Sequence, residues 1–227
     1  MDSLSEIIYF GGPEHQPFHF GSQNAPSALL LHGFFGTPAE MLGLGTGLAD
    51  AGWQAHSPLL PGFGTQVPQL KNTRGSDWLT AAQQAWAEHT PPHKPNLLVG
   101  YSMGSALAVQ VAASSPIPPS ALVLIAPFWR LPGLVNWAIP LAYPFIREVR
   151  PFERADFNDP KLRAKFGHML PGVNLDDPTV QQQLRREATL PVRVMAEVIW
   201  LGRAAYRLAK SLNLPVLIIQ GQHDPVV

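Results

Sequence analysis

The sequence predicts an α/β protein with a mainly parallel sheet. Short apolar runs of strand length, bounded by glycine or proline, alternate with segments of helical pattern. The chain has 227 residues, of which 46% are hydrophobic and 14% charged, a composition typical of a globular protein with extensive burial. Because alternating strands and helices are joined by right-handed crossovers, the strands are expected to run parallel.

The expected strands are continuous or alternating apolar runs, at 7–10, 17–20, 28–31, 53–57, 96–99, 121–125 and 215–220. The run at 28–31, between Pro26 and Gly33, contains no polar residue. That pattern is typical of a strand buried on both faces of a sheet.

The expected helices begin at recognisable start signals. Thr37 and Pro38 open a helix that runs to Gly52, although the glycines inside it weaken the pattern. Ser76 and Asp77 are expected to cap a helix that runs to residue 88. Further helical patterns lie at 105–113, 159–166, 179–187 and 192–208.

The apolar stretch 121–146 is long enough for a membrane span, but its sequence argues against one. Four prolines and Arg130 interrupt it, and prolines break a helix. We expect a strand followed by an irregular apolar cap. The chain is therefore divided into a first core part (1–127), a cap or lid insertion (128–212) and a continued core with the last strand and an acid loop (213–227).

Composition also narrows the class of protein. The formal net charge is zero, which gives no sign of a nucleic-acid partner or of an electrostatically bound membrane surface. The absence of cysteine excludes thiol catalysis, thiolate metal sites and disulfides. No metal or other cofactor is expected. The first residues lack the basic and apolar regions of a secretory signal, so a cytoplasmic location is expected.

The most informative motif is Gly100-Tyr101-Ser102-Met103-Gly104, a G-x-S-x-G pentapeptide between an apolar strand and an alanine-rich helix. In that context the motif is a nucleophile elbow, a sharp turn that presents a serine Oγ to a substrate carbonyl. Ser102 is therefore the expected nucleophile. The backbone N–H of Met103 is an expected donor to the oxyanion.

Four motifs in order make the chain resemble the α/β-hydrolase superfamily, and more narrowly its bacterial carboxylesterase and monoacylglycerol-lipase-like group. They lie at 32–34, 61–64, 100–104 and 221–227. The resemblance implies a central, mainly parallel sheet flanked by helices, with a helical cap before the last strand. It also implies that Phe34, after the His-Gly pair, supplies a second oxyanion amide. Phe63 stands where the family's Pro-Gly-His-Gly turn has histidine.

Asp224 is the expected acid of the triad, because it follows the last strand at the sheet edge where α/β sites form. The alternative is a turn aspartate before Pro225. The base should be a histidine after the acid, yet only three residues follow Asp224. Either the chain lacks a final strand, histidine loop and helix, or it is a degenerate hydrolase.

The histidines within the chain are weak substitutes for that base. His223 adjoins the acid in sequence but should point elsewhere, His168 lies in the cap, and His32 is expected to order the oxyanion loop. The others are expected on the surface or in loops: His15, His19, His56, His89 and His93.

Aromatic residues are expected to line the acyl site: Phe35, Phe128, Trp129 and Trp137. Packing of the cap on the core explains the last three equally well. The leading hypothesis is a serine hydrolase of small-molecule carboxylic esters. The alternatives are cleavage of another bond (amide, thioester or carbon–carbon), acyl transfer, or a non-catalytic ligand-binding homologue.

Overall fold

The structure is a computed structural model that describes residues 10–91, 93–131, 133–160, 162–163, 173–222 and 224. The strand expected at 7–10 therefore lies almost wholly outside the described residues, as does much of the helix expected at 159–166.

A six-stranded sheet forms the centre, in the order β1-β3-β2-β4-β5-β8. Its strands are β1 (Phe18–Phe20), β2 (Ser27–Leu31), β3 (Gln54–Ser57), β4 (Asn96–Tyr101), β5 (Ala121–Ile125) and β8 (Val216–Ile219). Among these six described strands, the edge strand β1 is antiparallel to β3, and the other four pairs are parallel. The predicted mainly parallel sheet is thus confirmed, and all five residues of β2 are buried, as its sequence predicts.

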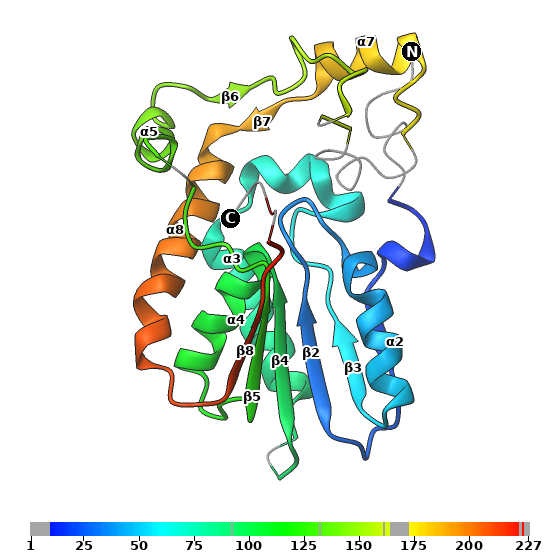
Figure 1. Ribbon diagram of the computed structural model, residues 1–227, viewed down its shortest axis with the longest axis vertical. Coiled ribbons are helices and arrows are strands. Elements are labelled where there is room, and N and C mark those ends of the chain that lie inside the picture. Colours follow the sequence, from blue (N-terminus) through cyan, green and yellow to red (C-terminus); the bar gives the residue numbers. More distant parts are fainter. Residues whose placement is uncertain are drawn as a thin grey trace.

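Helices cover the sheet on two sides (Figure 1). Helices α3 (Gly75–His89), α4 (Met103–Ser114) and α8 (Val192–Leu208) share one core with the side chains of Leu29 and Leu98. On the other face, Leu30 and Val99 join a second cluster, and α2 (Leu42–Asp50) covers that side. The helices expected at 37–52 and 76–88 are present. However, α3 begins at Gly75, and the Asp77 carboxylate accepts from the Arg74 N–H (2.8 Å).

Four short 3₁₀ helices complete the described core: η1 (Pro13–His15), η2 (Pro38–Met41), η3 (Gly64–Asn72) and η5 (Ala209–Ser211). The helix expected at 37–52 is therefore 3₁₀ in its first turn and α-helical afterwards.

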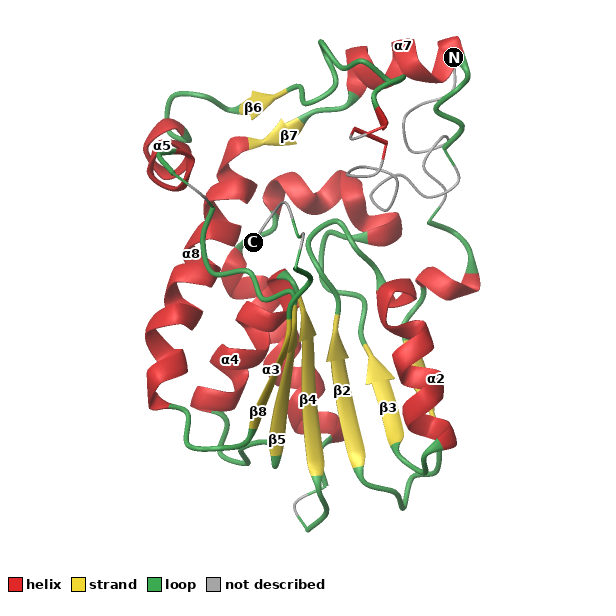
Figure 2. Ribbon diagram, viewed as in Figure 1, coloured by secondary structure: helices red, strands yellow, loops and turns green. Residues whose placement is uncertain are grey.

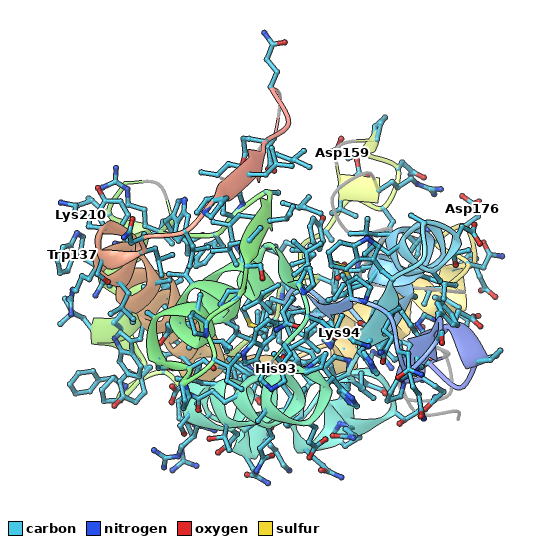
Figure 3. All side chains as sticks on the ribbon, turned by 90° about the horizontal axis from the view of Figure 1, so that it is seen from below. His93, Lys94, Trp137, Asp159, Asp176 and Lys210 are labelled. Carbon is cyan, nitrogen blue, oxygen red and sulfur yellow. The ribbon has the colours of Figure 1, made fainter. Side chains whose placement is uncertain are left out.

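Strand β8 is the exposed margin of the sheet. Its four apolar side chains are 43–57% exposed, and Figure 3 shows the strand, in pale red, standing at the edge of the molecule. On β5, Leu122 and Leu124 are buried while the alternate side chains are only half-buried. Within the described residues, the face of β5 and β8 opposite α4 is thus left largely uncovered.

The segment between β5 and α8 lies beyond the carboxyl ends of the parallel strands (Figure 2). It contains α5 (Val135–Ala142), β6 (Glu148–Val149), α7 (Pro178–Glu187) and β7 (Leu190–Pro191). A small core of Phe152, Phe157 and Leu184 holds it together. α8 lies in the range expected for the cap, yet packs along α4. The domain boundaries stay a prediction. Across the described ranges, no helix is both long and apolar enough to cross a membrane.

Helix α5 corrects one expectation, because residues 135–142 are helical and not irregular. Pro140 lies inside this helix and leaves the carbonyl of Asn136, four residues earlier, without its usual N–H donor. The Arg203 guanidinium of α8 donates to that carbonyl instead (2.6 Å). The same guanidinium lies 4.3 Å from the ring centroid of Trp137. The helix thus tolerates Pro140, which the sequence alone predicts to be disruptive, because Arg203 of another helix replaces the missing hydrogen-bond donor.

Three histidine rings lie against one another where the outer strands β1 and β3 meet the end of α3: His56 stacks on His89 and meets His19 edge-on. The ring centroid of His56 lies 3.9 Å from that of His19 and 3.8 Å from that of His89. Among the described residues, the buried His56 Nε2 has no hydrogen-bond partner. Burial, and then the charges of His89 and His19, lower the pKa of His56 to about 3. The folded protein therefore disfavours a proton at this ring.

This cluster predicts a loss of stability in mild acid. The unfolded chain binds a proton at His56 below its ordinary pKa of 6.5, whereas the folded chain resists it down to a pKa of about 3. The contribution is complete above pH 6.5 and is lost progressively as the pH falls toward 3. His56→Phe removes the titrating ring, so its melting temperature should fall less between about pH 7 and about pH 5 than that of the wild type.

Thermal unfolding followed by circular dichroism measures this difference. The exposed His93 provides the matched control, and His93→Phe should keep the wild-type pH dependence. An unchanged slope for His56→Phe would show that His56 is not a source of acid sensitivity.

Candidate active site

Three residues with strained backbone conformations lie just beyond the carboxyl ends of the parallel strands. Ser102, Phe35 and Ala126 have positive φ values of 52°, 60° and 42°, and they are the non-glycine residues with this conformation among those described. They lie on the segments that follow β4, β2 and β5, which are neighbouring strands. Each such residue costs on the order of 1–3 kcal/mol, and such costs cluster at functional sites.

The turn at Ser102 depends on the absence of side chains around it. Ser102 joins β4 directly to α4, and its N–H donates to the Ile125 carbonyl at the end of β5 (2.9 Å). A Cβ on Gly100 would collide with the Gly104 carbonyl oxygen, and a Cβ on Gly104 would collide with the Leu31 carbonyl oxygen. Both glycines therefore permit a close approach of backbone, as the pentapeptide predicts.

The start of α4 gives this turn an electropositive environment. Ser102 is half-buried, and Met103 is the first residue of the helix. The first N–H groups of a helix have no acceptor within it, and they carry the positive end of the helix dipole. Negative charge that develops beside Ser102 would therefore be stabilised.

The loop after β2 lies against Ser102. A Cβ built on Gly33 would be 3.4 Å from the Ser102 Cβ. The Gly33 carbonyl accepts from the Gly36 N–H (3.1 Å) and from His32 Nδ1 (2.9 Å). In a trans peptide the N–H points opposite to the C=O. Fixing the Gly33 carbonyl therefore fixes the direction of the Phe34 N–H.

His32 is fully buried and uses both ring nitrogens. Nδ1 donates to the Gly33 carbonyl, and Nε2 accepts from the Leu60 N–H (3.0 Å). Burial lowers the pKa of His32 to about 4, although the bond to Gly33 opposes the shift. The ring is neutral at physiological pH and has no free lone pair. This is the placement expected of a residue that orders the loop.

An aromatic cluster supports the loop from below. Phe63 is fully buried, and its ring centroid lies 5.5 Å from that of His32, 5.7 Å from that of Phe34 and 5.6 Å from that of Trp78. Phe34 and Phe35 are half-buried and pack on the same core. The side chain that replaces the family's histidine is thus a packing element beneath the Gly33 turn.

Asp224 lies at the same edge of the sheet. Its carboxylate accepts from Gln220 Nε2 (3.3 Å), and its N–H donates to the Gly221 carbonyl (3.3 Å). Burial raises the pKa of Tyr101, and the nearby charges of Glu40 and Asp224 raise it further. The charge of Asp224 therefore acts on the residue that precedes Ser102.

The histidines other than His32 are placed elsewhere or not described. His15 is bonded to Thr37 Oγ1 (2.8 Å), and His93 precedes β4 at the opposite edge, which Figure 3 views from below. His19, His56 and His89 form the histidine cluster described above. His168 and His223 lie outside the described residues. Each described histidine thus has another position or partner, and none is assigned as a base.

The expected acyl-site residues are not all brought together. Phe128 is buried, and its N–H donates to the Ser102 carbonyl (3.3 Å). The Trp129 carbonyl oxygen lies 2.6 Å from a Cβ built on Gly202, so Trp129 packs on α8. Trp137 is 63% exposed beneath Arg203, and Figure 3 labels it at the periphery. The Phe128 backbone thus contacts Ser102, Phe35 lies in the loop after β2, and Trp137 faces outward.

Glu40 is a residue of this site that the sequence interpretation missed. Its Oε2 accepts from the Gly33 N–H (2.9 Å), and burial raises its pKa to about 7. The signal that could have found it is the spacing Thr37-x-x-Glu40, which is typical of a glutamate that reaches back to a backbone N–H. In the described part of the chain, no group of acidic and histidine residues is arranged to hold a metal ion.

Two curated relatives each match a little under half of the chain. The thermostable monoacylglycerol lipase of Bacillus sp. (strain H-257) is 31% identical over 102 residues, which are 44% of this chain and 40% of the relative. The carboxylesterase of Bacillus subtilis (strain 168) is 29% identical over 104 residues, or 45% of this chain and 42% of the relative. The matched segment thus spans about two fifths of each relative's length.

Solved structures share the fold over nearly the whole chain. A structure reported for LipS and LipT, two metagenome-derived lipolytic enzymes, has a TM-score of 0.69 and 25% identity, covering 95% of this chain and 79% of that one. The monoacylglycerol lipase of Paleococcus ferrophilus has a TM-score of 0.63 at 16% identity, with 92% and 78% covered, and shows likeness of fold alone.

A family model extends over most of the sequence. The model described as "Serine aminopeptidase, S33" matches residues 23–227, which include the Gly33 loop, the Ser102 turn and Asp224. The protein therefore belongs to the serine aminopeptidase (S33) family, within the α/β-hydrolase group.

Proposed function

We propose that the protein is a serine hydrolase that cleaves carboxylic esters through an acyl-enzyme on Ser102. The observation that carries the proposal is the strained Ser102, held between the start of α4 and the Gly33 loop. Strain of this kind is retained where it positions a reacting group. The lipase and carboxylesterase relatives favour an ester over an amide, thioester or carbon–carbon bond.

The proposed reaction follows from the placement of each group. Ser102 Oγ attacks the acyl carbon, and the amides of Met103 and Phe34 hold the oxyanion that forms. The helix start contributes further positive potential. Collapse of the tetrahedral intermediate expels the alcohol and leaves the acyl group on Ser102. Water then attacks this ester and releases the acid.

Asp224 is proposed as the acid that orients a histidine base. That base is a histidine outside the described residues: His168, His223 or one encoded beyond Val227. It takes the Ser102 proton during attack and returns it to the leaving alcohol. A small-molecule ester is the proposed partner, with Phe35 and Phe128 nearest the acyl group, and a cytoplasmic location stays part of this proposal.

Replacement of the nucleophile gives the first test. Ser102→Ala in the full natural chain should lower hydrolysis of a short-chain p-nitrophenyl ester by about 10⁴-fold or more, because no acyl-enzyme can form. A fluorophosphonate probe, followed by peptide mass spectrometry, should place its adduct on Ser102. The matched control is Ser114→Ala, at the exposed far end of the same helix, which should keep wild-type turnover. An adduct on another residue would overturn the assignment, and a wild type without turnover or labelling would favour a non-catalytic homologue.

The acid gives an independent test. Asp224→Asn should leave the melting temperature close to that of the wild type yet lower kcat by about 10⁴-fold, because the histidine would be held in the wrong tautomer. Asp50→Asn, an exposed change at the end of α2, serves as the control. Near-normal turnover of Asp224→Asn would move the acid to another carboxylate.

A further inference from the structure

We propose that Glu40 is a positioning residue for the oxyanion loop, because its carboxylate holds the Gly33 N–H and thereby fixes the backbone that presents the Phe34 amide. The inference rests on the function proposed above and extends it to a residue outside the expected triad and oxyanion donors.

The short helix η2 aims Glu40 at the loop. Thr37 caps this helix by accepting from the Ala39 N–H (3.4 Å), and its carbonyl accepts from the Glu40 N–H (3.1 Å). His15 Nδ1 lies 2.8 Å from Thr37 Oγ1 and anchors the cap from outside. In a capping box the glutamate would return to the Thr37 N–H. Here its Oε2 lies 2.9 Å from the Gly33 N and accepts that N–H.

The loop is shaped to receive this carboxylate. Glu40 as a whole is exposed to solvent, but its carboxylate end is enclosed by the loop. A Cβ built on Gly36 would overlap this carboxylate, which therefore occupies the space that Gly36 leaves open. A Cβ built on Gly33 would lie 3.4 Å from Glu40 Oε2 and 3.4 Å from the Ser102 Cβ. Gly33 therefore lies close to both the glutamate and the serine.

Glu40 completes the restraint of Gly33 on both sides. The Gly33 carbonyl accepts from the His32 ring and from the Gly36 N–H, as described above. Those bonds fix the peptide plane after Gly33, and the bond to Glu40 fixes the plane before it. Glycine has the largest conformational freedom of any residue, so a restraint on only one plane would leave the other dihedral free. With Glu40 in place, both planes are set before substrate arrives.

A hydrogen-bond acceptor, and not a negative charge, is what the loop needs from Glu40. A charged carboxylate near Ser102 would oppose the developing oxyanion. Burial raises the pKa of Glu40 to about 7, so the neutral form is populated at neutral pH. A glutamine, whose amide oxygen accepts an N–H without charge, should therefore replace it.

The first experiment compares Glu40→Ala with Glu40→Gln in the full natural chain. Glu40→Ala should lower kcat by about 10- to 100-fold with KM changed less than about threefold, a smaller loss than the about 10²–10³ of an oxyanion donor itself. Affinity for a trifluoromethyl ketone, which forms an oxyanion on the serine, should fall with kcat. Glu40→Gln should restore kcat to within about threefold of the wild type. Glu88→Ala, an exposed glutamate on α3, is the control.

A second variant breaks the same contact without touching Glu40. In Gly36→Ala the new methyl would displace the end of the flexible Glu40 side chain, which folding tolerates. Its kcat should fall as in Glu40→Ala, and the double variant should be no slower than either single one, because both remove one interaction.

The outcomes separate this inference from the proposed function. If Ser102→Ala abolishes turnover while Glu40→Ala keeps wild-type kcat, Glu40 has no positioning role. Multiplicative losses in the double variant, or a Glu40→Gln enzyme as slow as Glu40→Ala, would also refute it. If Ser102→Ala itself keeps wild-type activity, the proposed function fails, whatever Glu40 does.

Discussion

The start of helix α4 lies so close to the end of strand β2 that no side chain fits between them. The Gly104 backbone faces the Leu31 carbonyl oxygen across this gap, and the Gly100 backbone faces the helix from the other side. Because of that approach, Ser102 and the Gly33 loop, which belong to different strands, lie side by side. A methyl group at either glycine would separate the two halves of the site.

This approach also explains where the strain lies and what maintains it. Three non-glycine residues with positive φ among those described follow the strands that meet at this edge. Beneath them the core is densely aromatic, with Phe63 and Trp78 stacked at 5.6 Å between ring centroids and both fully buried. Burial of such large rings stabilises the fold by several kcal/mol per residue, on the order of the strain above it. The packed layer therefore supports the strained one.

Much of this arrangement could be predicted from the sequence, because it depends on local patterns. The apolar run of β2, the strand–serine–helix order around Ser102 and the proline-opened segment at Pro38 each carry their own signal. The predictions failed where a distant partner decides the outcome. Pro140 is tolerated in a helix because Arg203 donates to the Asn136 carbonyl, which the proline leaves without a donor. No local sequence pattern predicts that hydrogen bond. The same guanidinium lies over the exposed ring of Trp137, whose place in the acyl site stays a prediction.

Glu40 shows a second way in which sequence patterns mislead. Its spacing from Thr37 indicates an ordinary helix cap, and the structure uses that spacing for a different backbone N–H, on Gly33. The pattern predicts that the glutamate side chain accepts from a nearby backbone N–H, but not which one, because the partner depends on where the loop after β2 lies. Residues that act through another residue are harder to predict than those in a motif.

The hydrogen bond from Arg203 to the Asn136 carbonyl, which Pro140 leaves free, links two segments that are distant in sequence. Arginine at 203 is of value to α5 chiefly because proline at 140 leaves the Asn136 carbonyl unpaired, and the proline is tolerable chiefly because the arginine is present. Neither residue is neutral to change while the other remains. During evolution of the protein, the two positions should therefore change together. If the cap segment were exchanged between relatives, it would keep its stability only when the contacting residue on α8 was exchanged as well.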